Sequence, residues 1–396
     1  MMKNDEFYIE IASTQLNKKG QAICGDVFLS KKIQEENRII TVLSDGLGSG
    51  VRANVLATLT ATMGLNFTIE RYPPEQTAQT ILDTLPVDKN RKISYATFTI
   101  VDSDADGETR IVNFDNPPIL IIRGRKLFQP DVRKKSLDSK PGTIRELVYS
   151  SFQAKIEDRI ILISDGVSQS GLGTATFPFG WDVPDIGGWI CRVLEQEPGI
   201  SASDLAGRIA ERAHANDIYS AKDDISCIVI YFRHPRKLLL CSGPPYHPAD
   251  DHRLAMTVES SNGQKVLSGG TTAEIVSREL GREIEVSLES LSADIPPVSV
   301  MQGIDLVTEG VLTLGRVSAR LEEGVKLPVR GKDAASALLS LLLNNDQIFL
   351  LAGTRINEAH QDPSLPVELE IRRNVVKKIK RLLEDKYLKE VHLDFI

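Results

Sequence analysis

The first 240 residues alternate short apolar runs with turns, a pattern typical of a domain that mixes strands and helices. Strands are expected where apolar residues alternate with polar ones or run unbroken between turn signals. The expected strands are EFYIEIAST, VFLSKKIQ, RIITVLSDG, SYATFTIVDSD, ETRIVNFDN, NPPILIIRGRKLF (a hairpin), RELVYSSFQ, DRIILISDG and DDISCIVIYFR. Helical spacing of apolar residues marks 51–69, 75–85 and 183–215.

The composition changes near residue 242, where SGPPYHPADD collects proline, glycine and aspartate. We expect this stretch to be a linker or an entry loop. The sequence therefore predicts two domains, 1–240 and 241–396, the second being a smaller α/β domain.

Three segments of the second domain have readable patterns. VLSGGTTAEIVSREL predicts a strand, a glycine turn and a helix. GIDLVTEGVLTL predicts a helix with Asp305 and Glu309 on its outer face. ELEIRRNVVKKIKRLLEDKY predicts an amphipathic helix whose basic side either faces solvent or contacts a partner or an anionic surface.

Four acidic positions in the first domain stand at the ends of apolar strands. Asp45 and Asp165 follow buried strands in two copies of Ser-Asp-Gly, 120 residues apart, and Asp26 and Asp223 precede apolar strands. If these strands pair in two sheets that face each other, the carboxylates meet at one end. Carboxylates that meet in a partly buried site repel one another. No lysine or arginine adjoins Asp45 or Asp165 in the sequence, so Mg²⁺ or Mn²⁺ is the expected counter-charge.

A single Asp-Gly after a strand is also an ordinary turn. The second copy, with the same apolar run before it, together with Gly25-Asp26 and Asp223-Asp224, favours a metal site over unrelated turns. Glycine lets the backbone approach a ligand, which leaves the Gly46 carbonyl available to a cation. Two ions about 3.5–4 Å apart can share a water, lower its pKa and hold the oxygens of a phosphoryl group.

Composition narrows the class of protein further. The net charge of −7 is spread along the chain and argues against bulk nucleic-acid binding. The four cysteines form no CxxC pair, which indicates reduced thiols that act as small apolar side chains. The polar N-terminus and the short apolar runs predict neither a signal peptide nor a membrane span. We expect a cytoplasmic protein.

The ordered motifs resemble those of metal-dependent protein serine/threonine phosphatases of the SpoIIE type, in the PPM superfamily. The resemblance covers roughly residues 8 to 233. The matching motifs are Gly25-Asp26, Ser44-Asp45-Gly46-Leu47-Gly48-Ser49-Gly50, Tyr95-Ala96-Thr97-Phe98, Asn116-Pro117-Pro118-Ile119-Leu120, Ser164-Asp165-Gly166-Val167 and Lys222-Asp223-Asp224-Ile225-Ser226.

The resemblance implies an α+β fold, a four-layer αββα sandwich, and an enzyme of bacterial signalling. It would hydrolyse a phosphoserine or phosphothreonine of a protein by in-line attack of a water or hydroxide that bridges two Mn²⁺ or Mg²⁺ ions. By position, Asp45 would bridge both ions, Asp26 and the Gly46 carbonyl would bind one, and Asp165 and Asp223 the other. Asp224 would support these ligands or exchange roles with Asp223.

Two features depart from the family pattern. Leu47 stands where many relatives have a histidine that could protonate the leaving group, so the general acid is unassigned. The arginine that binds phosphate in some relatives has no clear match. Lys18 or Lys19 could bind the substrate phosphate, or both could be solvated loop lysines.

The second domain offers two candidate ligand sites. The glycine turn before a helix, Gly269-Gly270-Thr271-Thr272, fits an anion site at a helix N-terminus and equally an ordinary capped turn. The polar loop at 350–366, with Asn357 and His360, fits a ligand site or a surface turn. We expect this domain to sense a regulatory ligand or partner.

Three functions remain open at this point. The intact acidic set favours a phosphoprotein phosphatase. A catalytically silent scaffold that binds a phosphoprotein and a small-molecule phosphohydrolase are the alternatives.

Overall fold

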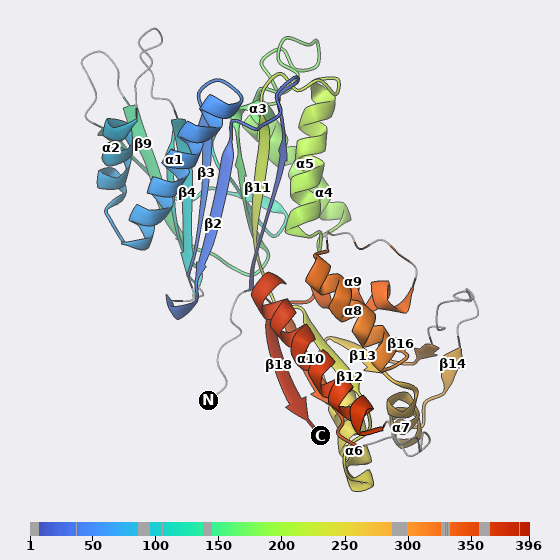
Figure 1. Cartoon of the computed structure of the whole chain (residues 1–396). Helices are drawn as coiled ribbons and strands as arrows, with labels where there is room; N and C mark the ends of the chain where they lie inside the picture. The colour runs from blue at the N-terminus through green and yellow to red at the C-terminus, as the bar shows by residue number, and fades with distance from the viewer. Residues whose placement is uncertain are drawn as a thin grey trace. The chain divides into compact units, whose positions relative to one another are not determined.

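The computed structural model (Figure 1) describes residues 8–36, 38–85, 96–104, 106–137, 145–286, 299–325, 329, 331, 333–355, 365–387 and 389–396. The chain divides into two compact units, Met1–His234 and Pro235–Ile396. Each unit has its own sheet system and its own core.

The first unit contains two antiparallel sheets. In the six-stranded sheet the order is β2 (Val27–Ile33), β3 (Arg38–Gly46), β4 (Ala96–Asp104), β5 (Glu108–Phe114), β9 (Arg145–Gln153) and β8 (Val132–Leu137). In the five-stranded sheet the order is β1 (Tyr8–Leu16), β11 (Ile225–Arg233), β10 (Asp158–Ile163), β6 (Leu120–Arg123) and β7 (Lys126–Phe128).

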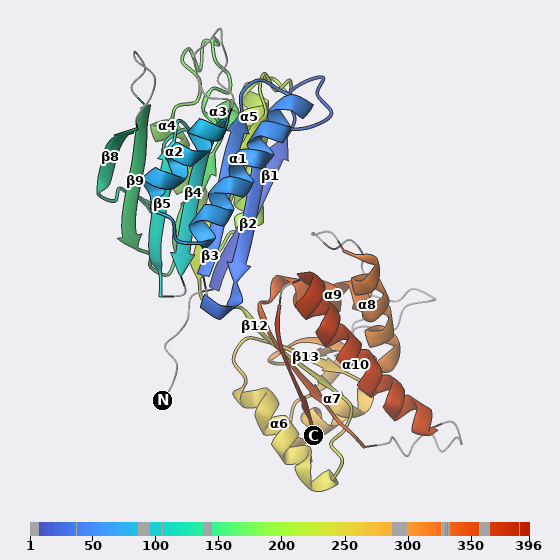
Figure 2. The same cartoon turned by 60° about the vertical axis from the view of Figure 1, so that its left-hand side comes forward.

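Helices cover the outer face of each sheet in this unit. Helices α1 (Val51–Ile69) and α2 (Pro74–Thr84) lie across the six-stranded sheet, as Figure 2 shows. Helices α3 (Asp165–Ser168), α4 (Val183–Gln196) and α5 (Ala202–Asn216) pack on the five-stranded sheet. A short η1 turn (Gln34–Glu36) joins β2 to β3.

Three apolar cores separate these four layers. Strand β3 contributes to two of these cores. Ile40 and Val42 pack toward α1 and α2, and Leu43 packs between the two sheets. The unbroken apolar run thus reflects burial on both faces, as the sequence predicted. The predicted αββα sandwich is confirmed.

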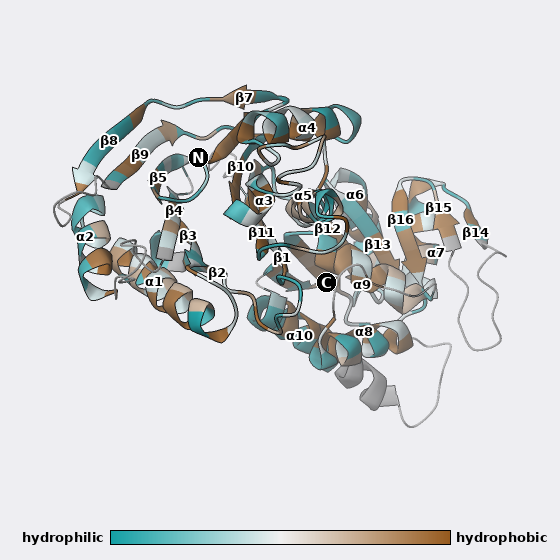
Figure 3. Cartoon of the chain, turned by 90° about the horizontal axis from the view of Figure 1, so that it is seen from above, coloured by the Kyte–Doolittle hydropathy of each residue, from teal (hydrophilic) through white to brown (hydrophobic). Residues whose placement is uncertain are grey.

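The edge strand β8 was not among the strands predicted from the sequence. Its residues, VRKKSL, are exposed except for Leu137, so neither an apolar run nor an alternation marks the strand. Figure 3 shows the contrast between the hydrophilic β8 and the hydrophobic central strand β10. Lysines on an edge strand discourage pairing with another chain.

The second unit is built on a seven-stranded sheet. Its order is β14 (Ile284–Val286), β15 (Ser299–Met301), β16 (Ile304–Thr308), β13 (Gln264–Ser268), β12 (Lys237–Ser242), β17 (Gln347–Ala352) and β18 (Glu390–Phe395). The strands from β16 to β18 are parallel, and in chain order they run 3-2-1-4-5, the order of doubly wound α/β folds. The predicted α/β class of this unit is confirmed.

The helices of the second unit follow its strands. They are α6 (Asp251–Ser260), α7 (Gly270–Leu280), α8 (Val311–Glu323), α9 (Ala334–Asn344) and α10 (Leu365–Tyr387), with the short turn η2 (Pro248–Asp250) before α6. None of the helices within the described ranges is both long and apolar enough to cross a membrane.

Two details of this unit differ from the sequence interpretation. The segment GIDLVTEGVLTL is not one helix: it forms β16, and α8 begins only after Gly310. A short apolar run fits a buried strand as well as a helix. Asp305 is exposed on β16, and its carboxylate accepts a hydrogen bond from the Lys265 N–H (2.7 Å). The stretch SGPPYHPADD is the entry loop to α6 rather than a linker, because β12 precedes it and the second unit already begins at Pro235.

Candidate functional site

Each sheet of the first unit contributes two of the predicted aspartates. Asp26 directly precedes β2 and Asp45 lies near the end of β3, and these strands are neighbours, with Val27 opposite Ser44. Asp165 follows β10, and Asp223 lies just before the neighbouring strand β11. Antiparallel neighbours place the end of one strand beside the start of the next, so each pair of carboxylates shares a sheet end.

Electrostatic coupling shows that the two pairs meet. Burial raises the pKa of Asp45 to about 10, and the next largest causes are the charges of Asp26 and Asp165, followed by that of Asp223. Burial raises the pKa of Asp165 as well, and the charge of Asp223 adds to the rise. Residues from both sheets therefore act on one carboxyl group, and the structure brings Asp26, Asp45, Asp165 and Asp223 together.

Asp26 is the most buried of the four, with 3% of its surface exposed. Burial raises its pKa to about 7, whereas hydrogen bonds from Ser226 and Ser164 act in the opposite direction. The Ser226 hydroxyl donates to the Asp26 carboxylate at 2.6 Å. Such a bond favours the ionised carboxylate, the form that binds cations.

The two Ser-Asp-Gly copies are built alike. The Ser44 hydroxyl donates to the Thr97 carbonyl (2.9 Å), and the Ser164 hydroxyl donates to the Asp224 carbonyl (3.2 Å). Each serine thereby fixes its strand end to a neighbouring segment, which positions the aspartate that follows.

The glycines of the two copies permit close backbone contacts. A Cβ on Gly46 would lie 2.2 Å from the Ala53 carbonyl oxygen of α1, and a Cβ on Gly166 would lie 2.2 Å from the Asp224 carbonyl oxygen. Neither contact has room for a side chain. The repeated tripeptide thus combines an anchored serine, a positioned carboxylate and a glycine that lets a neighbouring backbone pack against it.

Asp224 differs from Asp223 in its surroundings. The two Asp224 carboxylate oxygens accept the backbone N–H groups of Lys18 (2.8 Å) and Gly25 (2.9 Å), and 3% of the residue is exposed. Asp224 therefore braces the loop that carries Asp26. Asp223 is partly exposed and keeps its carboxylate toward Asp165 and the Lys18 ammonium group (3.5 Å).

The two candidate phosphate-binding lysines differ in their contacts with the aspartate cluster. The Lys18 side chain reaches the aspartate cluster through Asp223 and lowers the pKa of Asp165, although less than burial and Asp223 raise it. Lys19 is exposed, and its backbone N–H bonds the Ala221 carbonyl (3.0 Å). Only the Lys18 ammonium group thus lies beside the cluster.

Sequence reasoning missed two supporting side chains. Gln15 on β1 donates to the Asp26 carbonyl (3.2 Å) and to the Ser226 hydroxyl (3.0 Å). Ser226 belongs to the predicted motif Lys222-Asp223-Asp224-Ile225-Ser226, but the motif assigned no role to its hydroxyl. No local sequence pattern identifies Gln15 as a supporting residue, because its hydrogen-bond partners belong to distant segments of the chain.

The donor set fits hard divalent cations. The carboxylates of Asp26, Asp45, Asp165 and Asp223 supply oxygen ligands, and their mutual repulsion calls for positive charge beyond that of Lys18. Across the described ranges no three His, Cys, Asp or Glu side chains already stand as a formed metal site. The fit therefore rests on the coupling among the carboxyl groups and on their chemistry.

The candidate ligand residues of the second unit lie in separate environments. Gly269, with φ of +127°, and Gly270 form the turn from β13 into α7. The buried Thr272 hydroxyl accepts the Gly243 N–H at 2.8 Å, so it joins the loops that follow β12 and β13. Thr271 is partly exposed at the start of α7. Tyr95 of the first unit, Asn357 and His360 lie outside the described residues.

The unit that contains the two antiparallel sheets, with acidic residues at the ends of both, is the part of the chain that a known family matches. The model of the stage II sporulation protein E (SpoIIE) family matches residues 35–233, which is half of the chain. The protein belongs to the SpoIIE family.

Solved structures with a similar fold include two bacterial phosphatases. The phosphatase domain of the cell fate determinant SpoIIE from Bacillus subtilis is 18% identical, with 59% of this chain and 95% of that chain covered and a TM-score of 0.43. The serine/threonine phosphatase of S. agalactiae is 16% identical, with 57% and 99% covered and a TM-score of 0.39.

One curated protein also matches part of the chain. It is the RuBisCO large subunit-binding protein subunit alpha of Ricinus communis, 32% identical over 106 residues, or 27% of this chain. The chain spans about a fifth of the length of that relative, 19%.

Proposed function

We propose that the first unit hydrolyses phosphoserine or phosphothreonine in a protein substrate and depends on two Mn²⁺ or Mg²⁺ ions. The observation that carries the proposal is the coupling of the Asp45 carboxyl group to three further aspartates from two facing sheets. Membership of the SpoIIE family supports the reaction class. A role in bacterial signalling in the cytoplasm goes with this proposal.

The ions would be held by the Asp26, Asp45, Asp165 and Asp223 carboxylates and by the Gly46 carbonyl. When bound, the ions would supply positive charge for the phosphoryl oxygens and would lower the pKa of the attacking water. The charges of Asp26, Asp165 and Asp223 all act on Asp45, so Asp45 is the residue that both ions would share.

The chain's own groups would position the reactants. The Ser226 hydroxyl favours the ionised form of Asp26 and so opposes the burial that raises its pKa, and Asp224 fixes the backbone of the Lys18 and Gly25 loop. The Lys18 ammonium group stands at the exposed side of the cluster, where it would attract a phosphate group. We assign no general acid.

The experiment compares turnover of phosphoserine and phosphothreonine peptides by the full chain with Mn²⁺. Asp45→Ala should lose at least about 10²-fold in kcat, because it removes the shared ligand. Asp83→Asn, which changes an exposed aspartate on α2, is the matched control and should retain activity. Equal activity of Asp45→Ala and the wild type would contradict the proposal.

The same assay separates the alternatives. A phosphoprotein-binding scaffold would release no phosphate from an aryl phosphate with Mn²⁺ present. A small-molecule phosphohydrolase would prefer a panel of phosphorylated metabolites over the phosphopeptides.

We also propose that the second unit binds a regulatory ligand or partner beside the loop that follows β12. In doubly wound sheets the crevice at the carboxyl ends of the strands, where the strand order reverses, is the usual ligand site. Here that reversal lies between β12 and β17. The buried hydroxyl of Ser242, at the end of β12, has no hydrogen-bond partner among the described residues.

A thermal-shift screen of inorganic phosphate and nucleotides against the full chain tests this second proposal. A stabilising compound should stabilise the Ser242→Ala variant less. A stabilisation that the substitution leaves unchanged would place the ligand elsewhere.

A further inference from the structure

A cavity of about 320 Å³ lies between the α1–α2 connection and the six-stranded sheet of the first unit. Its buried floor comes from the sheet and from α2, through Ile100, Val112 and Thr77. Its more exposed rim includes Arg71, Tyr72 and Arg110. Asp45 stands at the other end of β3 from Arg38, which lines the cavity.

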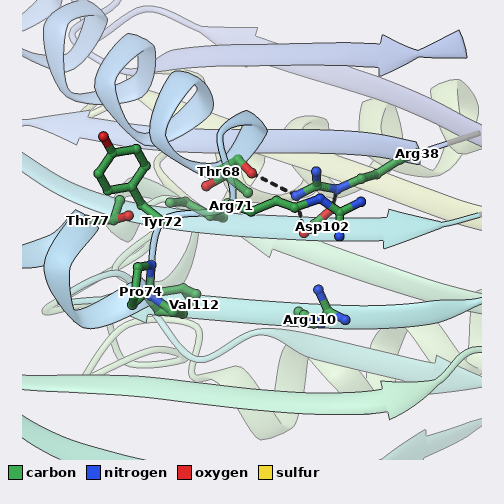
Figure 4. Close-up of a pocket in the computed structure, with 11 residues that line it drawn as sticks. Arg38, Thr68, Arg71, Tyr72, Pro74, Thr77, Asp102, Arg110 and Val112 are labelled. Atoms are coloured by element: carbon green, nitrogen blue, oxygen red, sulfur yellow. Dashed lines mark hydrogen bonds and ion pairs between the residues drawn. The ribbon is translucent and has the colours of Figure 1, made fainter. Parts of the chain in front are cut away.

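The two ends of the cavity differ in chemistry (Figure 4). The guanidinium groups of Arg38, Arg71 and Arg110 lie toward one end. Tyr72, Pro74 and Thr77 lie toward the other. A cavity of this size with apolar walls and a few polar groups at one end is typical of small-molecule sites.

Arg38 is fixed and has little left to offer a ligand. Its Nε and Nη2 donate to the Asp102 carboxylate (2.6 and 2.8 Å), and Nη2 also donates to the Thr68 carbonyl (2.7 Å). The side chain is 6% exposed. Arg38 therefore forms a rigid wall with its charge largely compensated.

Arg71 and Arg110 keep unused donors. Arg71 donates through Nη2 to Glu36 (2.9 Å), and Arg110 donates through Nε and Nη2 to Glu108. Within the described residues, Nε and Nη1 of Arg71 and Nη1 of Arg110 have no further partner. Two guanidinium groups with open N–H donors at one end of a cavity suit a planar carboxylate.

Thr77 supplies an independent sign of a missing ligand. Its hydroxyl is buried and has no hydrogen-bond partner within the described residues, although only 3% of the residue is exposed. Other threonines of the two helices satisfy their hydroxyls by donating to the carbonyl four residues earlier: Thr60, Thr68, Thr80 and Thr84. A buried hydroxyl without a partner is unusual, and a bound molecule would satisfy it.

Arg71 occupies an unfavourable backbone position. Its φ is +58°, at the end of α1, where glycine or asparagine commonly ends a helix. An arginine there holds a strained conformation, and strain of this kind is found where a side chain serves binding.

We propose that this cavity binds a small organic carboxylate with a ring-sized apolar body. The carboxylate pairs with Arg71 and Arg110, the ring packs against Tyr72, Pro74 and the apolar floor, and the Thr77 hydroxyl bonds a polar atom of the ligand. The site does not involve the aspartate cluster, so it does not depend on the proposed phosphatase activity.

The test is fluorine NMR of para-fluorobenzoate with the full chain in EDTA, which removes divalent cations. We expect binding with a dissociation constant below about 10 mM, and much weaker binding of the neutral para-fluorobenzamide. Absence of benzoate binding in this range, or equal binding of the amide, overturns the proposal.

Three variants locate the site. Arg71→Gly removes one guanidinium group and relieves the positive φ, so it should fold normally and weaken binding at least about tenfold. Thr77→Val removes the unsatisfied hydroxyl and should weaken binding of para-hydroxybenzoate, measured by its displacement of para-fluorobenzoate, between about twofold and tenfold, because the para hydroxyl can bond Thr77. Arg208→Gln changes an exposed, ion-paired arginine on α5 and should leave binding unchanged.

The same variants can refute the proposed location of the carboxylate site. If Arg71→Gly binds para-fluorobenzoate as well as the wild type, the carboxylate does not lie in this cavity. The same conclusion follows if Arg208→Gln weakens binding as much as Arg71→Gly does. Melting temperatures of all variants, which should stay at or above that of the wild type for Arg71→Gly and Thr77→Val, show that the fold is intact.

Discussion

Raising the pH should destabilise the first unit of the metal-free protein, and Asp45 should be the main cause. The unfolded Asp45 side chain titrates near its ordinary value of 3.8, whereas burial and neighbouring charges raise its pKa to about 10 in the fold. Between these values the folded protein holds a proton that the unfolded chain has released. Stability therefore falls as the pH rises through this window.

The size of the effect follows from this one proton. One proton more in the folded state changes the free energy of unfolding by about 1.4 kcal/mol per pH unit. From pH 6 to pH 8 the loss from Asp45 is therefore at most about 3 kcal/mol. For a unit of this size that loss corresponds to a decrease in Tm of about 6–12 °C. Asp26, whose pKa is raised to about 7, adds a smaller loss over the lower part of the range.

Tryptophan fluorescence is a suitable assay, because both tryptophans, Trp181 and Trp189, belong to the first unit. Trp181 is buried and packs edge-on against Trp189, with ring centroids 5.6 Å apart, so unfolding should change its emission. Urea unfolding in EDTA at pH 6 and pH 8 gives the free energy of unfolding at each pH.

The Asp45→Asn variant separates this carboxyl group from others that titrate. It carries no proton-dependent charge at position 45, so its stability should depend less on pH, and at pH 8 it should exceed that of the wild type. At pH 8, Mn²⁺ should raise the free energy of unfolding of the wild type but not that of the variant. An identical pH dependence of the two proteins would refute the reasoning.

Further predictions concern the parts that support the cluster. Gly166→Ala forces a Cβ against the Asp224 carbonyl and should cost about 1–3 kcal/mol in urea unfolding and most of the activity. Gly188→Ala, whose Cβ would meet only the Arg192 side chain at 3.8 Å, should cost neither. Ser226→Ala removes a bond that favours the ionised Asp26, so half-saturation should need about tenfold more Mn²⁺ while kcat at saturating Mn²⁺ is kept; an unchanged half-saturation would contradict this role. Asp102→Asn breaks the buried pair with Arg38 and should cost about 3–5 kcal/mol by urea unfolding; a loss below about 1 kcal/mol would mean that the pair is solvated.

Much of the first unit could be predicted because its chemistry lies at strand ends. A buried strand has a strong apolar signal, so Asp45 and Asp165 could be placed at the ends of β3 and β10 from the sequence. The facing of the two sheets followed from the family resemblance rather than from any pattern of residues.

The remaining details depend on contacts between distant segments. The role of Asp224 depends on backbone N–H groups about two hundred residues earlier, at Lys18 and Gly25, which no local pattern reveals. Strand β16 was taken for part of a helix because Asp305 and Glu309 are four residues apart, although Gly310 separates the strand from α8. The arginine-lined cavity joins side chains from three strands and two helices, each of which is unremarkable alone.

The measurement that tests the central claim most directly is a calorimetric titration of the metal-free full chain with Mn²⁺. The account predicts two Mn²⁺ ions per chain, both lost or greatly weakened in Asp45→Ala and both retained in Asp83→Asn. Binding that is absent from the wild type, or that is the same in Asp45→Ala, would contradict the claim that these aspartates hold the ions.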